Sequence, residues 1–421
     1  MCDTLCVLGD GVALFAKNSD RPVAEDQVVQ AHARRSGGGR LRTQYLELDD
    51  AGAAATVLSR PTWLWGAEHG VNEHGVAVGN ELVDTVDDPG AAPPALIGMD
   101  LVRLGLERAG DAEGAVEVMT ALLERHGQGG VGDEVHALAY WSSFLVADAA
   151  SAWVLETSGR RWAARPLAGG GAISNRLTLG RDWARASAGV EPGTDVGTWR
   201  DPATPTGFAD GRLAAGRAFV AGRPASGPGR CDPRAAVAHL RDHGAGPWGA
   251  PGAGGPVPDP PAEVLADGTG VTVCMHVRDF EATTASMVAE LRAEPGRPGR
   301  AWVALGNPCA SVYVPVLLPA AGAAGGPAAE VPGRPARVPA ALGEVALARR
   351  FAAVARAVES RQGALEEVRS VLGPVEDRLW AEADELGDDA ARWEAFVERV
   401  PGALGAGLDA LAGAGIGGPS R

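Results

Sequence analysis

The sequence contains very little lysine, isoleucine or asparagine. Among 421 residues there are one lysine, three isoleucines and five asparagines, whereas alanine, glycine, arginine and proline dominate. This bias is expected when a GC-rich genome has depleted the residues with AT-rich codons, so the polar residues that remain are informative. Lys17 and Asn18 are adjacent, Asn72 and Asn80 lie in one short segment, and Asn175 stands alone. These survivors are the first candidates for a functional site.

The sequence also lacks cysteine motifs, lysine-rich runs and long apolar runs. The five cysteines are scattered and form no C-x-x-C, so we expect neither a disulfide framework nor a thiolate metal site. A net charge of −15 without a lysine-rich run argues against binding to nucleic acid or to an anionic membrane. No stretch reaches eighteen uninterrupted apolar residues, and the start M-C-D-T-L-C does not resemble a signal peptide. We therefore expect a cytoplasmic protein.

A cysteine directly follows the initiator methionine. Its side chain is small enough for methionine aminopeptidase to remove Met1, which would leave Cys2 with a free α-amine. Such an amine has an unperturbed pKa of roughly 7.7 to 8.0 and can act as general base for the adjacent thiol. These groups are the equipment of an N-terminal nucleophile hydrolase, although many chains begin with Met-Cys and carry an inert thiol.

The first strands predict a polar cluster around this cysteine. Two apolar runs, residues 4–8 and 12–18, are joined by Gly-Asp-Gly, a pattern typical of a β-hairpin. Pairing across the loop places Cys2 opposite Asn18, within one position. Because opposed Cβ atoms lie roughly 4.5 to 5.5 Å apart, the single lysine and Asp20 should converge on the chain terminus.

The rest of the chain reads as strands, then helices, then strands, which indicates sheets packed on one another with helices outside. We expect further strands at 42–48, 54–58, 67–71, 75–80, 143–148, 152–157, 161–165, 271–277, 284–290 and 301–305. Helices are expected from Met99 to Arg108, from Asp111 to Gly127, at 233–242 and within 343–399. Residues 186–229 and 244–262 are rich in glycine and proline and predict long surface loops. The predicted organisation is a domain at 1–319, an Ala/Gly/Pro-rich linker at 320–339 and a helical extension at 340–421. The apolar face of this extension is expected to pack on the first domain or on a partner subunit in a homo-oligomer.

A thiol hydrolase needs a nucleophile, a base, a group that orients the base and donors for the oxyanion. Cys2 supplies the first two, and Lys17 would favour the thiolate because a neighbouring cation lowers a cysteine pKa. Asp20 can orient the α-amine. Asn80 and Asn175 carry N–H donors suited to an oxyanion hole, where the loss of one donor typically costs about 2.7 to 4 kcal/mol.

Several motifs resemble the secernin and dipeptidase A family. They are M-C-D-T, K-N-S-D-R, S-R-P-T-W-L-W-G-A-E, G-V-N-E-H-G-V-A-V-G-N-E, G-M-D-L-V-R-L-G-L-E-R-A, I-S-N-R and T-T-A-S-M-V, in order over roughly the first 310 residues. The resemblance implies an α+β fold, a four-layer αββα sandwich, and hydrolysis of amide bonds without metal or organic cofactor. Bacterial members are dipeptidases, whereas animal secernins lack an established peptidase activity. The wider group includes bile-salt hydrolases and penicillin V acylases.

The resemblance also implies roles for individual residues. Cys2 matches the nucleophile, Asp20 the carboxylate near the amine, and Asn80 and Asn175 the two site asparagines. Lys17 occupies the place where the acylases carry arginine, which keeps the charge and loses the bidentate fork. For the carboxylate of a dipeptide, the candidates are Arg21, Arg176 and Arg230, because a guanidinium pairs with a carboxylate in bidentate fashion.

Three other interpretations stay open. His69 and His74, with Glu68 and Glu73, could suggest a metal site, but on a strand these histidines point to opposite faces, so we expect structural or rim roles and no metal. A catalytically silent binding protein could keep the fold as a scaffold. An acylase for non-peptide amides would need an apolar pocket, which could be lined by Trp63, Trp65, Trp141 and Trp162. The preferred prediction is a cysteine hydrolase. Its expected binding partners are its substrates, which are dipeptides or similarly small amides.

Overall fold

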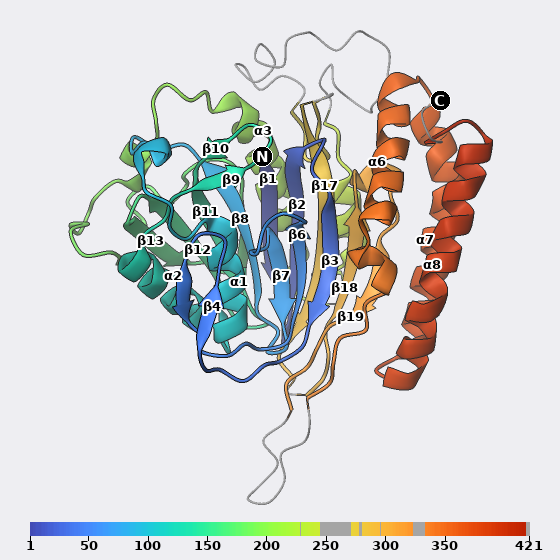
Figure 1. Cartoon of the computed structure of the whole chain (residues 1–421), viewed down its shortest axis with the longest axis horizontal. Coiled ribbons are helices and arrows are strands. Elements are labelled where there is room, and N and C mark those ends of the chain that lie inside the picture. Colours follow the sequence, from blue (N-terminus) through green and yellow to red (C-terminus); the bar gives the residue numbers. More distant parts are fainter. Residues whose placement is uncertain (228, 245–270, 278–279, 295, 323–332, 418–421) are drawn as a thin grey trace, which may run out of the picture.

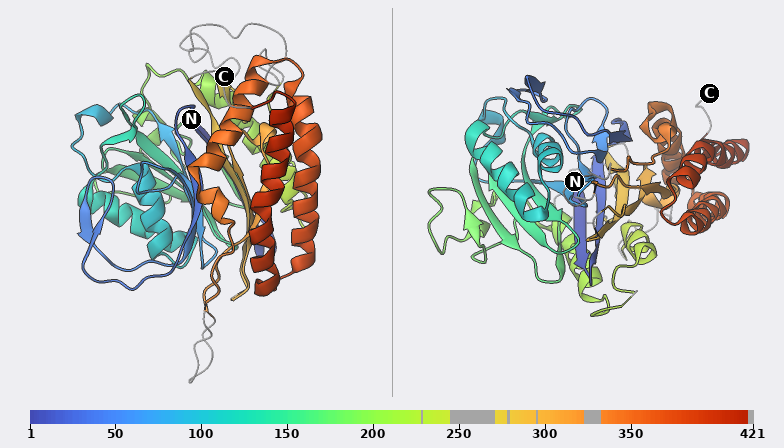
Figure 2. Two further views of the ribbon diagram at one scale, coloured as in Figure 1. Left: turned by 45° about the vertical axis from the view of Figure 1, so that its right-hand side comes forward. Right: turned by 90° about the horizontal axis from the view of Figure 1, so that it is seen from below.

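Two large antiparallel sheets lie face to face with helices on their outer sides (Figure 1). The computed structural model describes residues 1–227, 229–244, 271–277, 280–294, 296–322 and 333–417. Within these ranges the expected α+β fold of two antiparallel sheets flanked by helices is confirmed. Figure 2, seen from below, shows the helices on both sides of the stacked sheets.

The first sheet contains the N-terminal hairpin at its centre. Its strand order is β14-β1-β2-β17-β18-β19, and the short β16 also pairs with β17. The strands are β1 (Cys2–Leu8), β2 (Val12–Pro22), β14 (Gly170–Ile173), β16 (His276–Val277), β17 (Glu281–Arg292), β18 (Arg300–Leu305) and β19 (Val314–Leu317). β1 is an interior strand that pairs with β2 along its whole length and with β14 from Thr4 to Val7, and this pairing positions the start of the chain.

The second sheet faces the first and has the order β15-β13-β12-β11-β8-β7-β6-β3. Its strands are β3 (Gln27–His32), β6 (Thr56–Pro61), β7 (His69–Asn72), β8 (Ala77–Val83), β11 (Trp141–Ala147), β12 (Ala152–Ser158), β13 (Arg161–Pro166) and β15 (Arg185–Ala186). Two small ribbons lie outside both sheets: β4 (Arg40–Arg42) with β5 (Glu47–Asp49), and β9 (Val131–Asp133) with β10 (Leu138–Ala139). The predicted strand 42–48 is therefore wrong, because a turn separates β4 from β5.

Helices cover the outer faces. They are α1 (Gly98–Arg108), α2 (Ala112–His126), α3 (Gly207–Ala221), α4 (Pro233–Leu240), α6 (Val345–Ser360), α7 (Ala364–Leu386) and α8 (Ala390–Gly413), with short 3-10 turns η1 (Pro89–Ala91), η2 (Val196–Trp199), η3 (Pro308–Ala310) and η4 (Ala340–Gly343). Asp111 caps α2 through a bond from the backbone N–H of Gly114, as its sequence predicts. None of the described helices is long and apolar enough to cross a membrane.

Alternating side chains on the strands build separate apolar layers. Phe15 and Leu145 belong to the core between the sheets, whereas Leu14 and Val288 belong to the core under α3 and α4. Phe144, the neighbour of Leu145, packs under α1 and α2. The strict alternation follows from the two-residue period of a strand.

The predicted hairpin exists, with a register shifted by one residue. Leu8 pairs with Ala13, so Cys2 lies opposite Ser19 and Thr4 opposite Lys17. The shift is within the margin of one position that a three-residue loop allows. It matters for the site because each one-residue slip turns a side chain to the other face of the sheet.

The segment 186–229, expected to be loop, contains the helix α3. Its buried residues Phe208, Ala209, Arg212, Leu213 and Gly216 recur at helical spacing. The glycine content masked this pattern in the sequence. Of the second expected loop, 244–262, only residue 244 lies within the described residues, so the rest of that prediction lies outside them.

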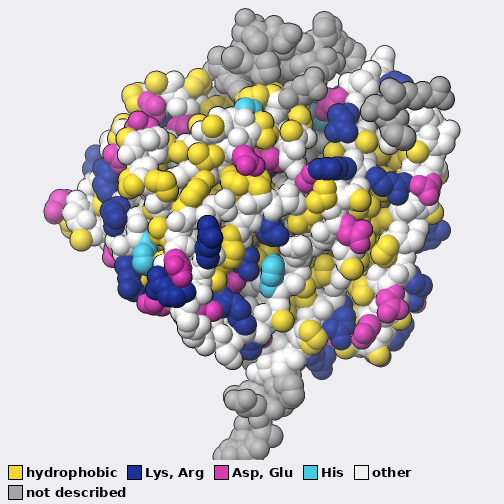
Figure 3. Space-filling view, viewed as in Figure 1, with side chains coloured by type: hydrophobic (Ala, Val, Ile, Leu, Met, Phe, Trp, Pro, Cys, Tyr) yellow, Lys and Arg dark blue, Asp and Glu magenta, His cyan; other side chains and the backbone are white. Residues whose placement is uncertain are grey.

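The C-terminal helices pack on the sheets. Phe351 of α6, Leu372 of α7 and Phe396 of α8 belong to the same apolar cluster as residues of β18 and β19. Residues 323–332 of the expected linker lie outside the described residues, and its two ends run antiparallel through a bridge between Ala320 and Arg334. On the face in Figure 3, acidic and basic side chains are interspersed.

Candidate active site

Cys2 opens on a cavity of about 280 Å³ at the end of the N-terminal hairpin. Its polar lining includes Asp20, Arg21, Glu68, Asn80 and Glu281, and its apolar lining includes Leu82, Leu138, Tyr140 and Phe280. Cys2 itself is 4% exposed. A small molecule in this cavity would therefore touch the thiol in surroundings largely shielded from water.

The backbone N–H of Cys2 donates to Asn175 Oδ1 at 2.8 Å. The amide nitrogen of Asn175 donates to the carbonyl of Leu82 at 2.9 Å. Asn175 thus presents its oxygen to Cys2, whereas the sequence analysis expected it to present an N–H to an oxyanion. This geometry suits a group that holds an α-amine in place.

Lys17 is fully buried beside the thiol. Its ammonium donates to the carbonyl of Asn80 at 2.6 Å and lies 3.7 Å from Glu81 Oε1. Burial opposes the charged form, but interactions with the Cys2 sulfur, Glu81 and Glu68 outweigh it and raise the pKa of Lys17 above its usual value. Lys17 is therefore a permanent positive charge at neutral pH.

The pKa of the Cys2 thiol is nevertheless raised, because burial outweighs the lowering effect of Lys17. The terminal amine also lowers this pKa, and Glu68 and Asp20 raise it further. As expected, Lys17 lowers the pKa of Cys2, but this effect is smaller than the increase caused by burial. Cys2 is held as a neutral thiol, so its activation requires a base.

Asp20 lies on β2 close to the chain terminus. Its Oδ1 accepts from the hydroxyl of Thr283 at 2.6 Å, and its Oδ2 is buried without a hydrogen-bond partner among the described residues. Burial raises the pKa of Asp20 to about 6, against the opposing charges of the terminal amine and Arg212. Asp20 therefore carries a free acceptor next to the residue whose amine it was expected to orient.

Arg212 of α3 is a site residue that the sequence reasoning missed. It is 2% exposed and donates to Cys2 O at 3.1 Å, to Asp3 Oδ2 at 2.7 Å and to Asn175 Oδ1 at 2.8 Å. It also lies 3.8 Å from Asp20 Oδ2. One guanidinium thus joins four groups around the nucleophile. The helical spacing of the apolar residues in 207–221 was the signal that could have identified it.

Glu68 is the second missed residue. Its Oε2 lies 4.0 Å from Cys2 Sγ, and its Oε1 lies 3.4 Å from a nitrogen of Arg21. With the Asn80 amide oriented to satisfy both of its ends, Nδ2 donates to Glu68 O at 2.9 Å and to Glu68 Oε2 at 3.1 Å. The position of Glu68 within W-L-W-G-A-E was the available signal, although the sequence favoured a structural or rim role.

The three arginine candidates for a substrate carboxylate occupy different places. Arg21 lies on the cavity wall, but its donors are taken by Glu25, Tyr140 and the carbonyl of Gly132. Arg176 pairs with Asp210 near the surface and does not line the cavity.

Arg230 lies at the opposite end of β1 from Cys2. It donates to the carbonyls of Leu8, Pro224 and Gly169. The structure therefore does not bring Arg230 into this site, and Arg212 is the arginine found there instead. Arg230 was a candidate because a guanidinium can pair with a carboxylate, and the sequence did not reveal the course of the surrounding loop.

The open alternatives can also be located. His69 is buried in β7, whereas His74 is exposed in the following turn, so the two do not share a site. The four tryptophans proposed for an acyl pocket do not line the Cys2 cavity. Trp141 packs between the sheets and Trp162 under the helices.

The cavity also contains the terminal residue itself. The α-ammonium of Met1 donates to the carbonyl of Asp20 at 3.0 Å and forms an ion pair with Glu281. Burial lowers the pKa of this amine. An amino acid with a free ammonium, joined through its carbonyl to Cys2, therefore already fits here.

No protein-family model matches the chain. Among solved structures, it is similar to a variant of conjugated bile acid hydrolase from Clostridium perfringens, with a TM-score of 0.43 and 12% identity over 72% of this chain and 88% of that chain. It is also similar to penicillin V acylase from Agrobacterium tumefaciens, with a TM-score of 0.40 and 12% identity over 72% of this chain and 83% of that chain. Identity this low carries no information about chemistry or substrate.

Proposed function

We propose that cleavage of the Met1–Cys2 bond converts this protein into a thiol hydrolase of small amides, with dipeptides as the preferred substrates. The observation that carries the proposal is the surroundings of the Cys2 nitrogen. Asn175 Oδ1 already accepts from it, and Asp20 Oδ2 is a buried acceptor without a partner among the described residues. These two acceptors would hold a free α-amine beside its own thiol.

The reaction would proceed through an acyl-enzyme. The neutral α-amine of Cys2 removes the thiol proton while Sγ bonds to the substrate carbonyl carbon, and the negative charge moves to the carbonyl oxygen. The positive charge of Lys17 stabilises that charge, whereas the N–H groups of Asn80 already donate to Glu68. When the tetrahedral intermediate collapses, the C–N bond breaks and the α-ammonium returns its proton to the leaving amine. Water then hydrolyses the thioester and restores the thiol.

The preference for dipeptides rests on the contents of the cavity. Glu281, which now pairs with the Met1 ammonium, would pair with the ammonium of a substrate. Leu82, Leu138 and Phe280 would contact an apolar side chain on the acyl residue. The donors of Arg21 are already taken within the protein, so recognition of the amino end should dominate over recognition of the carboxylate.

The test uses a chain produced behind a cleavable tag so that Cys2 is the first residue. Dipeptides with an apolar first residue are compared with the same peptides acetylated at their amine and with fatty-acyl amides. We expect turnover of the free dipeptides only, and no turnover by Cys2→Ala or by the chain that keeps one residue before Cys2. Cys231→Ala, which changes another buried cysteine, should retain full activity.

Three outcomes separate the alternatives. Turnover that persists in Cys2→Ala would refute the mechanism. A preference for acetylated or fatty-acyl amides would replace the dipeptidase with an acylase. Absence of turnover on every amide, together with failure of a small electrophile to label Cys2 in an intact mass measurement, would favour a binding protein without catalysis.

A further inference from the structure

Two histidines and two cysteines from three separate segments meet near Thr283, the residue that donates to Asp20. They are His243, just after α4; Cys274 and His276, before and within β16; and Cys309, in η3. One ligand atom from each residue lies within 4.8 Å of each of the others. All except His243 are buried. Nothing in the spacing of the cysteines indicated this cluster, and no metal site was predicted from the sequence.

Two distances within the cluster are close to the edges of a tetrahedral zinc site. His276 Nε2 lies 3.2 Å from Cys309 Sγ and 3.4 Å from Cys274 Sγ. Zinc bonds of about 2.0 to 2.1 Å to nitrogen and 2.3 Å to sulfur give tetrahedral edges of about 3.3 to 3.8 Å. The ring of His243 packs against that of His276 with centroids 5.2 Å apart, and His243 Nε2 is buried without a partner among the described residues.

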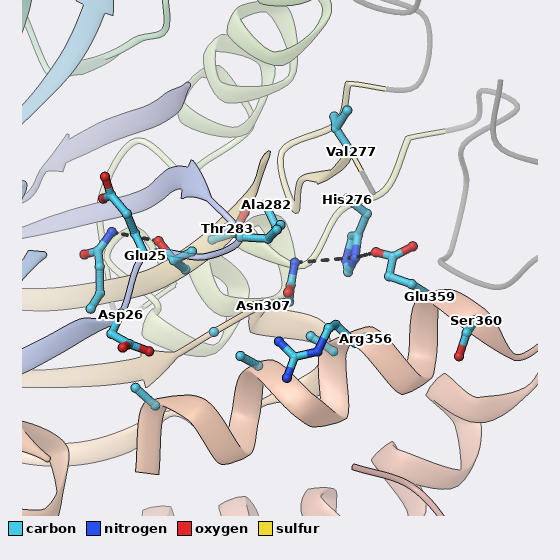
Figure 4. A pocket seen from close by; sticks show the side chains of 17 residues that line it. Glu25, Asp26, His276, Val277, Ala282, Thr283, Asn307, Arg356, Glu359 and Ser360 are labelled. Atoms are coloured by element: carbon cyan, nitrogen blue, oxygen red, sulfur yellow. Dashed lines mark hydrogen bonds and ion pairs between the residues drawn. The ribbon is translucent and has the colours of Figure 1, made fainter. Parts of the chain in front are cut away.

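The other ring nitrogen of His276 is held from outside the cluster. Nδ1 pairs with Glu359 of α6 and lies 3.4 Å from Asn307 Nδ2 (Figure 4). A carboxylate on the far nitrogen is the usual companion of a metal-bound histidine, because it fixes the ring orientation and the tautomer. This arrangement aims Nε2 at the two sulfur atoms.

We propose that His243, Cys274, His276 and Cys309 bind one Zn²⁺ ion in a closed, structural site. Two thiolates and two imidazoles form a complete tetrahedral ligand set, and they leave no open position for a substrate. The residue types favour zinc over magnesium or calcium, which prefer oxygen ligands.

The same residues could be read as a Cys-His-Glu triad made of Cys309, His276 and Glu359. A cavity of about 410 Å³ is lined by His276 and Glu359 but by neither cysteine of the cluster. A substrate in that cavity would not reach a sulfur atom. The triad would also leave Cys274 and His243 without a role, whereas a tetrahedral ion uses all four side chains.

The proposed ion would also support the candidate active site. Met275 lies between two ligands, and its N–H donates to the Thr283 hydroxyl at 3.0 Å, which in turn donates to Asp20 Oδ1. Asn307 Nδ2 donates to the carbonyl of Met275 at 2.8 Å. Removal of the ion is therefore expected to loosen the segment around Met275 and, through Thr283 of β17, the position of Asp20.

The test measures zinc directly. The full-length chain is reduced, treated with a chelator, supplied with Zn²⁺, separated from free metal and analysed for metal content. We expect about one zinc ion per chain in the wild type and in Cys231→Ser, which changes a buried cysteine outside the cluster. Cys309→Ser should retain less than about a tenth of that amount, since it replaces one ligand of a four-ligand site.

A second measurement does not depend on the folding of a variant. Co²⁺ added to the reduced wild type should give the intense visible bands of a tetrahedral ion and the ultraviolet charge-transfer bands of thiolate ligands. The proposal is overturned if the reduced wild type takes up neither metal or if Cys309→Ser binds zinc as the wild type does. A mass lower by two hydrogen atoms that persists under the reducing conditions would overturn it in favour of a disulfide. Amide turnover that persists in Cys2→Ala but is lost in Cys309→Ser would overturn it in favour of a triad.

Discussion

Replacement of Arg212 by methionine should destabilise the protein far more than an ordinary change of charge. The guanidinium is 2% exposed and pairs with Asp3 Oδ2 at 2.7 Å, and Asp3 itself is 7% exposed. Methionine keeps much of the apolar volume and removes the charge. Asp3 would then remain as a buried carboxylate without its partner, and Cys2 O and Asn175 Oδ1 would each lose a donor.

The expected loss of unfolding free energy is about 3 to 5 kcal/mol, which is typical when one partner of a buried ion pair is removed. This is a large part of the 5 to 15 kcal/mol that stabilises an ordinary domain. Asp3→Asn removes the charge that Arg212 neutralises. In that background, Arg212→Met should cost about 1 to 3 kcal/mol less, since residues in contact show coupling of this size.

The assay is urea unfolding followed by tryptophan fluorescence for both single variants and the double variant. Arg176→Met is the matched control, because Arg176 also pairs with an acidic residue but is 33% exposed, and its partner Asp210 is 45% exposed. Its expected cost is below about 1 kcal/mol. Equal costs for Arg212→Met and Arg176→Met, or no coupling between Arg212 and Asp3, would refute the assignment of Arg212 as the buried link.

Two further predictions concern pH. Turnover should rise as the pH passes about 6, where burial places the pKa of Asp20 and above which its carboxylate can hold the α-amine; Asp20→Asn should be slow at every pH and lack this rise in a profile of kcat/KM. Burial raises the pKa of Glu156 from 4.5 to about 7, despite the donors of Thr178 and Leu179. Because the pKa of Glu156 is higher in the folded state, protonated Glu156 contributes fully to the free energy of unfolding below its unfolded pKa, and this contribution is lost as the pH rises through about 7. Between pH 5 and pH 8, the free energy of unfolding of Glu156→Gln should therefore increase by about 2 to 3 kcal/mol relative to that of the wild type, at 1.36 kcal/mol per pKa unit. Urea unfolding at the two pH values measures this difference. An unchanged difference between the two pH values would contradict the Glu156 prediction.

Local patterns identified much of the architecture. Periodicity and capping predicted α1 and α2 to within about a residue, and strand alternation predicted most strands of both sheets. The N-terminal hairpin was also visible, because a Gly-Asp-Gly loop between apolar runs is a local signal. These elements depend on contacts between near neighbours in the sequence.

The missed residues depend on long-range contacts. Arg212 reaches Cys2 across more than two hundred residues, and only the docking of α3 on β1 and β14 brings it there. Arg21, Arg176 and Arg230 were named as candidates for the chemistry of their guanidinium groups, without knowledge of that docking. The cluster around His276 was hidden for the same reason, because its residues come from three segments that are distant in the sequence and meet only in the tertiary structure.

The register of the hairpin decides whether Lys17 reaches the thiol at all. Pairing partners on adjacent strands share a face, and neighbours along a strand point to opposite faces. In the observed register, Thr4 opposes Lys17, so Lys17 and Cys2 both face the second sheet. In the register estimated from the sequence, Lys17 would oppose Asp3 and point toward α3 instead. Gly79 of β8 accommodates the observed arrangement, because a Cβ atom there would lie 2.6 Å from Lys17 Cδ. The absence of a side chain at Gly79 in the second sheet thus leaves room for the buried Lys17 side chain of the first sheet.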